Sequence, residues 1–396
     1  MSPGESVYVA GGALSRFGRS RDRSTPRDWV RAVVAEALAD ARMEPAAIDA
    51  LVFASETDFL TLQLVPAPWL TDELGLTPRP AVRVESGGAS GGQAVRTGVL
   101  HVRARAARTV LVVGYEFAAS HLAGDDVRTL YGLSFDADLE GFAGATATAL
   151  YALSIQAHMA AHGTTEAQMA AVSVRNHRNA IANPQAHKPM RITIDDVLAS
   201  TPVSTPYKLL DCSLISDGAA ALLLTGDRQL VRRDRPAVRI SGTGCATDHV
   251  RLGDRSDVGV FAGKRASAAQ AFAEAGIVDA RRDITIAELY DAYTGAELQG
   301  LEALGLARPG EAGPAALTGE FAIGGRITVN ASGGLIGQGG PPGATGIAQV
   351  ATVAKLLAGT YHPALQPARP GRHGVADCHA GVATLNVTHV LERLDD

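Results

Sequence analysis

Cysteine is scarce in this 396-residue chain, which has only Cys212, Cys245 and Cys378. An odd, sparse set with no C-x-x-C pair excludes a disulfide framework and fits a reducing compartment, so we expect a cytoplasmic protein. The chain lacks an apolar run of about 18 residues, and its first residues lack the layout of a signal peptide, so no membrane contact is expected.

Other signals are also missing. The histidines do not fall at metal-site spacings, so the sequence predicts no metal. Net charge is only −5, and no finger or RNP-like pattern occurs, which argues against a nucleic-acid partner. With 46% hydrophobic residues the chain has the composition of a globular protein with a sizeable core.

Two distant parts of the chain share the order strand, helix, strand. Near the start, a Gly-punctuated strand at 7–12 precedes a helical pattern at 29–45 and a buried strand at 47–56 that ends near a carboxylate. The same order recurs later, as a strand at 237–248, a helix at 267–284 and a strand at 285–293. The recurrence predicts two similar α/β halves, and the coincidence of two common units is the alternative.

We place these halves at residues 1–230 and 236–396, on either side of a charged linker. Buried strands are expected at 108–118 and 216–226. Between them, a helical insertion at about 115–210 contains two or more helices and a helix cap near Thr165. We expect this insertion to wall a substrate site.

Two glycine-rich segments each separate a strand from a helix. The first, at 84–92, contains Gly88 and Ser90, and it puts backbone N–H groups at a helix N-terminus, where an anionic oxygen is stabilised. The second, at 330–346, contains Asn330 and Gly340 and lets backbone approach a ligand closely. The alternatives are a tight packing turn for the first segment and a flexible surface loop for the second.

Two shorter segments carry groups that can transfer protons. Tyr290 and Tyr293 flank Asp291 at the end of a buried strand, and a tyrosine acts as acid or base if its pKa is brought down from about 10. Cys378 and His379 lie in an expected turn before the last strand. Aromatic packing and a structural histidine are the respective alternatives.

Together these four segments resemble the thiolase superfamily over essentially the whole chain, and most closely its sterol-carrier, lipid-transfer type. Further matches carry the resemblance, namely Asn176–His177, Asn179–Ala180, Asn183–Pro184, Leu209 to Cys212 and Ser216 to Ala221. The resemblance implies an α/β thiolase fold, in which two βαβαβαββ halves form five α-β-α-β-α layers. It also implies a homodimer, paired through the strand at 108–115.

The departures from the family pattern fall at its catalytic positions. The family's nucleophilic Cys falls on Gly88, its acidic-strand His or Asn on Tyr290, and the Phe of that motif on Tyr293. Its activating His falls on Gly340, and its last acid/base Cys near His379. Thiolysis needs a thiolate and a base to activate it, and Gly88 supplies neither.

A retro-aldol cleavage of a β-hydroxyacyl-CoA needs no nucleophile and fits the groups that remain. We expect Tyr290 or Tyr293 to take the hydroxyl proton, with Asp291 orienting it, and His379 to protonate the enolate or share the first role. Gly88, Ser90 and the Asn330 loop would hold the thioester oxygen. Gly340 and Cys378 are further substrate-binding candidates.

The sequence resembles the aldolases of bacterial sterol side-chain degradation, which implies a partner with an OB-fold domain of the DUF35 class and makes a steroid acyl group plausible. We expect no cofactor beyond the coenzyme A of the substrate. Two alternatives stay open: an acyltransferase or condensing subunit whose nucleophile comes from another chain, and a non-catalytic thiolase-like subunit.

Overall fold

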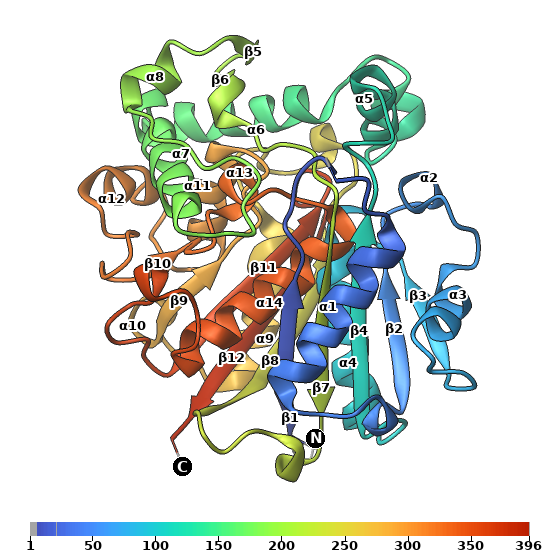
Figure 1. Cartoon of the computed structure of the whole chain (residues 1–396). Helices are drawn as coiled ribbons and strands as arrows, with labels where there is room; N and C mark the ends of the chain where they lie inside the picture. The colour runs from blue at the N-terminus through green and yellow to red at the C-terminus, as the bar shows by residue number, and fades with distance from the viewer. Residues whose placement is uncertain (1–5, 21, 396) are drawn as a thin grey trace.

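A computed structural model describes residues 6–20 and 22–395 (Figure 1). It contains a ten-stranded sheet in the order β10-β9-β11-β12-β8-β1-β7-β4-β2-β3. The first half of the chain supplies β1 (Val7–Leu14), β2 (Ala50–Ala54), β3 (Ala81–Val84), β4 (Thr109–Glu116) and β7 (Gly218–Thr225). The second half supplies β8 (Ala237–Thr247), β9 (Ile284–Glu288), β10 (Thr328–Val329), β11 (His373–Ala380) and β12 (Leu385–Leu394).

The two half-sheets repeat one topology. Numbered within its own half, each has the strand order 3-2-4-5-1, and strands 2, 3 and 4 run parallel in both. The half-sheets meet where β1 pairs with β8 through two residue pairs, Val7 with Ile240 and Tyr8 with Arg239. The strand–helix–strand recurrence in the sequence therefore corresponds to a structural repeat.

Helices form three layers around the half-sheets. The outer faces are covered by α1 (Pro26–Ala41), which packs on β1 and β7, and by α9 (Ala262–Ala275), which packs on β8 and β12. Between the half-sheets lie α4 (Ser90–Arg103) and α14 (Pro342–Ala358), which contact each other and strands of both halves. The result is the five-layered α-β-α-β-α thiolase fold.

The central helices approach closely because glycines face each other at their first turns. A Cβ atom on Gly346 would lie 2.1 Å from the backbone nitrogen of Gly92, and one on Gly91 would lie 2.8 Å from the nitrogen of Gly346. Any side chain at these positions would push the two helices apart. The glycines therefore fix how the two halves meet.

Most predicted elements are present, but two helices begin earlier than expected. α9 begins at Ala262 and α14 at Pro342, each five residues before the start of its predicted pattern. In α14 the apolar periodicity starts late because the first turn consists of small residues that pack between the sheets. A Pro at the first helical position, as at Pro342, is compatible with a helix start.

Two local predictions are wrong. Cys378 and His379 lie inside strand β11, and the chain turns only after Ala380. The strand at 108–115, expected to pair with a second subunit, is β4, which already pairs with β2 on one side and β7 on the other. The outermost strand of this half is β3. Homodimerisation stays a prediction.

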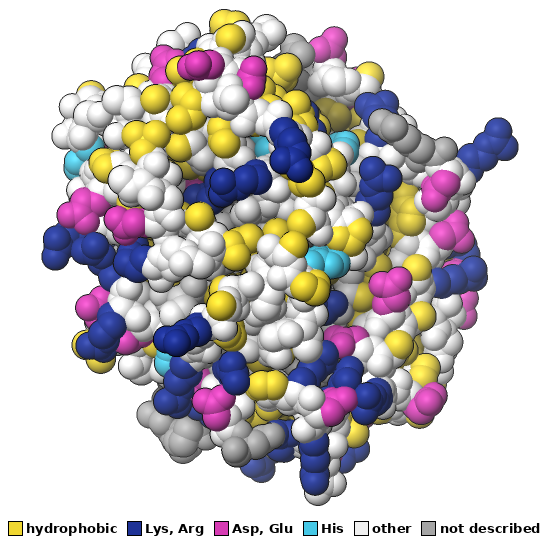
Figure 2. Space-filling model, turned by 60° about the vertical axis from the view of Figure 1, so that its left-hand side comes forward, with side chains coloured by type: hydrophobic (Ala, Val, Ile, Leu, Met, Phe, Trp, Pro, Cys, Tyr) yellow, Lys and Arg dark blue, Asp and Glu magenta, His cyan; other side chains and the backbone are white. Residues whose placement is uncertain are grey.

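The insertion contains α5 (Gly124–Gly132), α6 (Ala147–His162), α7 (Glu166–Ile181), α8 (Ile194–Leu198) and a hairpin of β5 (Pro202–Ser204) with β6 (Tyr207–Lys208). The Thr165 hydroxyl caps α7 by accepting a hydrogen bond from the Gln168 N–H, as predicted. These elements cover one end of the sheet (Figure 1). Figure 2 shows hydrophobic side chains gathered at this end, with charges of both signs interspersed below. Among the described residues, no helix is long and apolar enough to cross a bilayer.

Candidate active site

A pocket of about 330 Å³ lies where the parallel strands of both halves end. Its floor includes Glu56 after β2, Gly88 after β3, Tyr290 after β9, and His379 at the end of β11. The carboxyl ends of parallel strands are the usual place for a ligand site in such sheets. The insertion forms the opposite wall, with Tyr131, Phe135, Thr148, Tyr151 and Leu209 among its lining residues.

Position 88 offers no room for a side chain. A Cβ atom on Gly88 would lie 2.5 Å from the Tyr290 hydroxyl and 2.9 Å from the His379 carbonyl oxygen. Both distances are too short for a real Cβ contact. The phenol of Tyr290 therefore occupies the space into which a nucleophilic side chain at position 88 would extend.

The two sequence-predicted tyrosines both line the pocket as neutral phenols. Burial raises the pKa of Tyr290 well above its usual value, and Cys378 and Glu56 add to the rise. Burial likewise raises the pKa of Tyr293, whose hydroxyl lies 2.8 Å from the Thr148 Oγ1 atom. Neutral phenols donate hydrogen bonds rather than accept protons. This environment is opposite to the lowered pKa that a tyrosine base requires.

His379 lines the pocket with both ring nitrogens engaged. Its Nδ1 atom lies 2.9 Å from Lys264 Nζ, and its Nε2 atom 2.7 Å from the Tyr151 hydroxyl. Because an ammonium group only donates, Nδ1 accepts from Lys264 and Nε2 carries the hydrogen. Burial lowers the pKa of His379 well below its usual value, and Lys264 lowers it further.

Lys264 also pairs with the Asp377 carboxylate, and both side chains are almost fully buried. The Tyr151 hydroxyl donates to the Gly381 carbonyl oxygen. The resulting network runs from Asp377 through Lys264 and His379 to Tyr151. It holds His379 as a neutral imidazole, which makes it a positioning group for Tyr151 rather than the free acid expected from the sequence.

Glu56 is the pocket's ionisable carboxyl group. Burial raises its pKa to about 8, Glu85 adds to the rise, and the Tyr131 hydroxyl opposes it. Its Oε2 atom is buried without a hydrogen-bond partner among the described residues. Behind it, Glu116 accepts a hydrogen bond from the Glu56 N–H, and burial raises the pKa of Glu116 well above its usual value. Glu56 is thus a carboxyl group that exchanges a proton near neutral pH.

Asp291 and Asn330 lie outside the pocket wall, contrary to expectation. Asp291 accepts hydrogen bonds from Asn176 Nδ2 at 2.7 Å and from the Leu335 N–H at 2.6 Å. Asn330 accepts from the Leu289 N–H at 2.7 Å and donates to Glu297 at 2.8 Å. Their side chains hold the segments after β9 and β10 in place, so Asp291 does not orient a tyrosine and the Asn330 amide does not face a thioester.

Ser90 and Cys378 shape the glycine turn from behind. The Ser90 hydroxyl accepts from the Ser86 N–H at 2.9 Å and donates to the Gly87 carbonyl at 2.7 Å. The Cys378 thiol contacts the Gly88 carbonyl oxygen at 3.3 Å, and burial raises its pKa to about 12. Both residues support Gly88 instead of binding substrate directly.

Gly340 does line the pocket, as predicted. Its N–H donates to Ser216 Oγ at 3.2 Å, and a Cβ atom would lie 3.0 Å from the Leu335 side chain. Cys212 is the one cysteine in the pocket wall, and burial raises the pKa of its thiol to about 12. A thiol held protonated is a poor nucleophile.

Sequence reasoning missed Lys264, Tyr151 and Glu56. Lys264 stands in an Ala-rich helix and looks like a surface lysine, and its partner Asp377 is 113 positions away. Tyr151 stands in an apolar helical run. Glu56 left a detectable signal, because a carboxylate directly after a buried strand was visible in the sequence.

Comparison with known proteins agrees with this geometry. The chain matches the family described as thiolase, N-terminal domain, over residues 7–194, and the family described as thiolase C-terminal domain-like over residues 244–393. It is 37% identical to an acetyl-CoA acetyltransferase of Methanothermobacter thermautotrophicus, covering 89% of this chain and 91% of that protein. It is 27% identical to sterol carrier protein 2 of Oryctolagus cuniculus, covering 89% and 67%.

Among solved structures, the fold is similar to an Ltp2-ChsH2(DUF35) aldolase, with a TM-score of 0.83, 24% identity and 99% coverage of both chains. At that identity the likeness concerns the fold. Members of this superfamily are enzymes that act on acyl-CoA. The chain belongs to the thiolase superfamily, as a sterol-carrier-protein-2-like member.

Proposed function

We propose that this protein cleaves the Cα–Cβ bond of a β-hydroxyacyl-CoA in a retro-aldol reaction. The products are a ketone or aldehyde and a shortened acyl-CoA. The observation that carries the proposal is the Tyr290 hydroxyl, which fills the side-chain space of Gly88. A pocket so arranged has a proton donor where thiolysis requires a nucleophile.

The reaction moves a single proton within the substrate. A base removes the β-hydroxyl proton, the electron pair of the O–H bond forms the new carbonyl, and the Cα–Cβ bond breaks. The electron pair of that bond forms the thioester enolate, which is then protonated at Cα. No oxidant, reductant or second substrate is needed.

Glu56 is the group best suited to remove the hydroxyl proton. A carboxyl group with a pKa of about 8 is partly ionised at neutral pH and is a stronger base than an ordinary carboxylate. Tyr290, held neutral, then donates its proton to Cα of the enolate, and the proton that Glu56 removed returns to the Tyr290 phenolate. The Gly88 backbone and Tyr293 are the remaining groups for the thioester oxygen. This assignment replaces the tyrosine base expected from the sequence, and the role of His379 becomes that of positioning Tyr151.

For the substrate and partner we propose a bulky acyl group, with a steroid as the first candidate, and a DUF35-class protein. The likeness in fold to an Ltp2-ChsH2(DUF35) aldolase supports the choice of partner, and the similarity to sterol carrier protein 2 supports the choice of acyl group. The pocket adds apolar surface from Val127, Phe135 and Leu214, which suits a hydrophobic acyl chain.

The test incubates the protein, alone and with a DUF35-class protein, with a panel of β-hydroxyacyl-CoA esters. Mass spectrometry then follows the ketone and the shortened acyl-CoA. We expect both products in equal amounts, and a loss in Tyr290→Phe of about 10²-fold or more. Tyr361→Phe, a buried tyrosine outside the pocket, is the matched control. Turnover of no ester, or full activity of Tyr290→Phe, contradicts the proposal.

An acyltransferase or condensing role is the second candidate, favoured by the identity to an acetyl-CoA acetyltransferase over most of the chain. The nucleophile would then come from another chain, since Cys212 stays protonated. Radiolabelled acyl-CoA distinguishes the two functions, because acyl transfer leaves label on a protein and retro-aldol cleavage does not. Absence of both label transfer and cleavage would indicate a non-catalytic subunit.

A further inference from the structure

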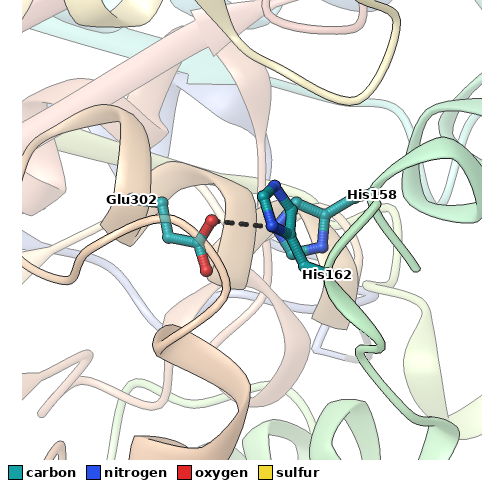
Figure 3. A group of neighbouring side chains, drawn as sticks. All are labelled: His158, His162 and Glu302. Atoms are coloured by element: carbon teal, nitrogen blue, oxygen red, sulfur yellow. Dashed lines mark hydrogen bonds and ion pairs between the residues drawn. The ribbon is translucent and has the colours of Figure 1, made fainter. Parts of the chain in front are cut away.

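A second polar cluster lies away from the pocket, where the end of α6 meets the end of α11 (Thr294–Ala303). His158, His162 and Glu302 each direct a ligand atom into one small space, and all these atoms lie within 4.8 Å of one another. Figure 3 shows the two imidazoles facing the carboxylate across the gap between the helices. None of the three lines the pocket.

The two histidines are brought together by helix geometry. They are four residues apart in α6, so their side chains lie on the same face of the helix one turn apart. Their rings are 4.8 Å apart. This spacing is that of a helical metal-binding pair, and the sequence-based statement that no histidines fall at such a spacing was wrong.

The donor set suits a transition metal. Two imidazoles and one carboxylate are zinc ligands, at about 2.0–2.2 Å from the ion, and an open site keeps a fourth position for water. The Nε2 atom of His158 already lies 2.8 Å from Glu302 Oε2, and its Nδ1 atom lies 3.2 Å from Thr164 Oγ1. A histidine that binds a metal through one ring nitrogen typically hydrogen-bonds a protein group through the other, as His158 Nδ1 does with Thr164.

The cluster is buried on one side and open on the other. The side chains of His158 and Glu302 are only 2% and 8% exposed, whereas His162 is an exposed residue at the helix end. Solvent therefore reaches the position beside His162, which provides an entry path and room for a water ligand.

We propose that His158, His162 and Glu302 form a binding site for a divalent metal ion of the zinc class, which joins α6 to α11. The metal takes the place of the proton between His158 Nε2 and Glu302, and that proton leaves to solvent. The role is structural. The opposite ends of the same helices meet at the pocket, where Thr148 on α6 bonds Tyr293 just before α11. The site therefore fixes α6, which supplies Thr148 and Tyr151 to the pocket wall, against α11.

The test titrates metal-free protein with Zn²⁺ in competition with a chromophoric chelator. We expect one zinc ion per chain. Thr164→Val, which removes only the outer partner, should weaken binding by about 10- to 100-fold, and His162→Gln should weaken it further. His249→Gln, another exposed histidine, serves as the matched control and should bind like the wild type.

Thermal unfolding supplies an independent readout. Zinc should raise the melting temperature of the wild type in proportion to the logarithm of its concentration, and should raise that of His162→Gln much less at the same concentrations. Because His162 is exposed, its replacement leaves the fold intact. Equal zinc affinity in the wild type and His162→Gln, or no zinc binding at all, overturns the proposal and leaves His158 and Glu302 as a buried ion pair only.

Discussion

Two buried polar clusters border the pocket, one from each half of the chain, and they differ in whether a cation is hydrogen-bonded to a carboxylate. In the first half, Glu56 and Glu116 lie together, and burial and mutual repulsion raise the pKa of Glu116. In the second half, Lys264 pairs with Asp377 and bonds His379. Burial raises the pKa of both glutamates, that of Glu56 to about 8, whereas the paired cluster is a fixed support.

Removing the cation from the second cluster should have the largest effect. Lys264→Met leaves the Asp377 carboxylate buried and unpaired, so we expect the free energy of unfolding to fall by about 3–5 kcal/mol. Urea denaturation measures the change. The double variant Lys264→Met/Asp377→Leu should recover much of the loss, because an apolar pair replaces an ion pair. A single variant as stable as the wild type would show that the ion pair contributes nothing.

Removing the ionisable group of the first cluster should affect activity and spare the fold. Glu56→Gln keeps the shape of the side chain but cannot take a proton, so kcat should fall by about 10²–10⁴-fold. Steady-state kinetics on a cleaved ester measures this. Glu44→Gln, on the exposed surface, is the control. Unchanged kcat in Glu56→Gln would remove Glu56 from the mechanism.

The same variant tests the sign of the pH dependence of stability. The folded-state pKa of Glu56 is raised to about 8, above the unfolded value, so the folded protein retains a proton that the unfolded chain loses. The contribution of Glu56 to the free energy of unfolding is fully present below the pKa of the unfolded chain. It falls as pH rises towards 8. Glu56→Gln should therefore lose less stability between pH 5 and about pH 8–9 than the wild type, as measured by thermal unfolding.

Filling the space between the clusters should have a moderate effect. Gly88→Ala places a Cβ atom against the Tyr290 hydroxyl and the His379 carbonyl, which should cost about 1–3 kcal/mol of stability. Tyr290→Phe removes the closer contact. The double variant Gly88→Ala/Tyr290→Phe should therefore lose less stability than the two single variants lose in total. Strict additivity would show that the two positions do not share space.

The smallest effect should come from the neighbour that tunes Glu56. The Glu85 carboxylate raises the pKa of Glu56 and accepts a hydrogen bond from the Gly87 N–H, which a glutamine also satisfies. In the wild type, kcat should rise with pH as Glu56 loses its proton. Glu85→Gln should move this rise to lower pH by less than about one unit. A shift to higher pH would contradict the assignment of that rise to Glu56.

The fold was predictable because its signals are local. The helical period at 29–45, the apolar strands and the Thr165 cap are each set by neighbours within a few positions. Helix starts at Ala262 and Pro342 were missed because small residues carry little periodicity. Cys378 and His379 looked like a turn since polar residues with a following glycine are typical of one, but strand pairing with β12 overrides that preference.

The site was predictable only in part, since its contacts join distant positions. Gly88, Tyr290, Tyr293, Gly340 and His379 do reach the pocket. Asp291 and Asn330 were misplaced because a buried polar side chain near a strand end can face either the pocket or the scaffold, and only tertiary packing decides between them. Lys264 gave no local signal at all, as its partners belong to the last part of the chain.

The steric exclusion between Gly88 and Tyr290 has an evolutionary consequence. A cysteine introduced at position 88 alone would place its Cβ atom in the space that the Tyr290 hydroxyl fills, so this single substitution does not by itself create a thiolase site. The tyrosine has to change first, and that step removes the proposed proton donor before a nucleophile exists. A stepwise exchange of these two residues thus passes through a protein that has neither the phenol nor the thiol in place.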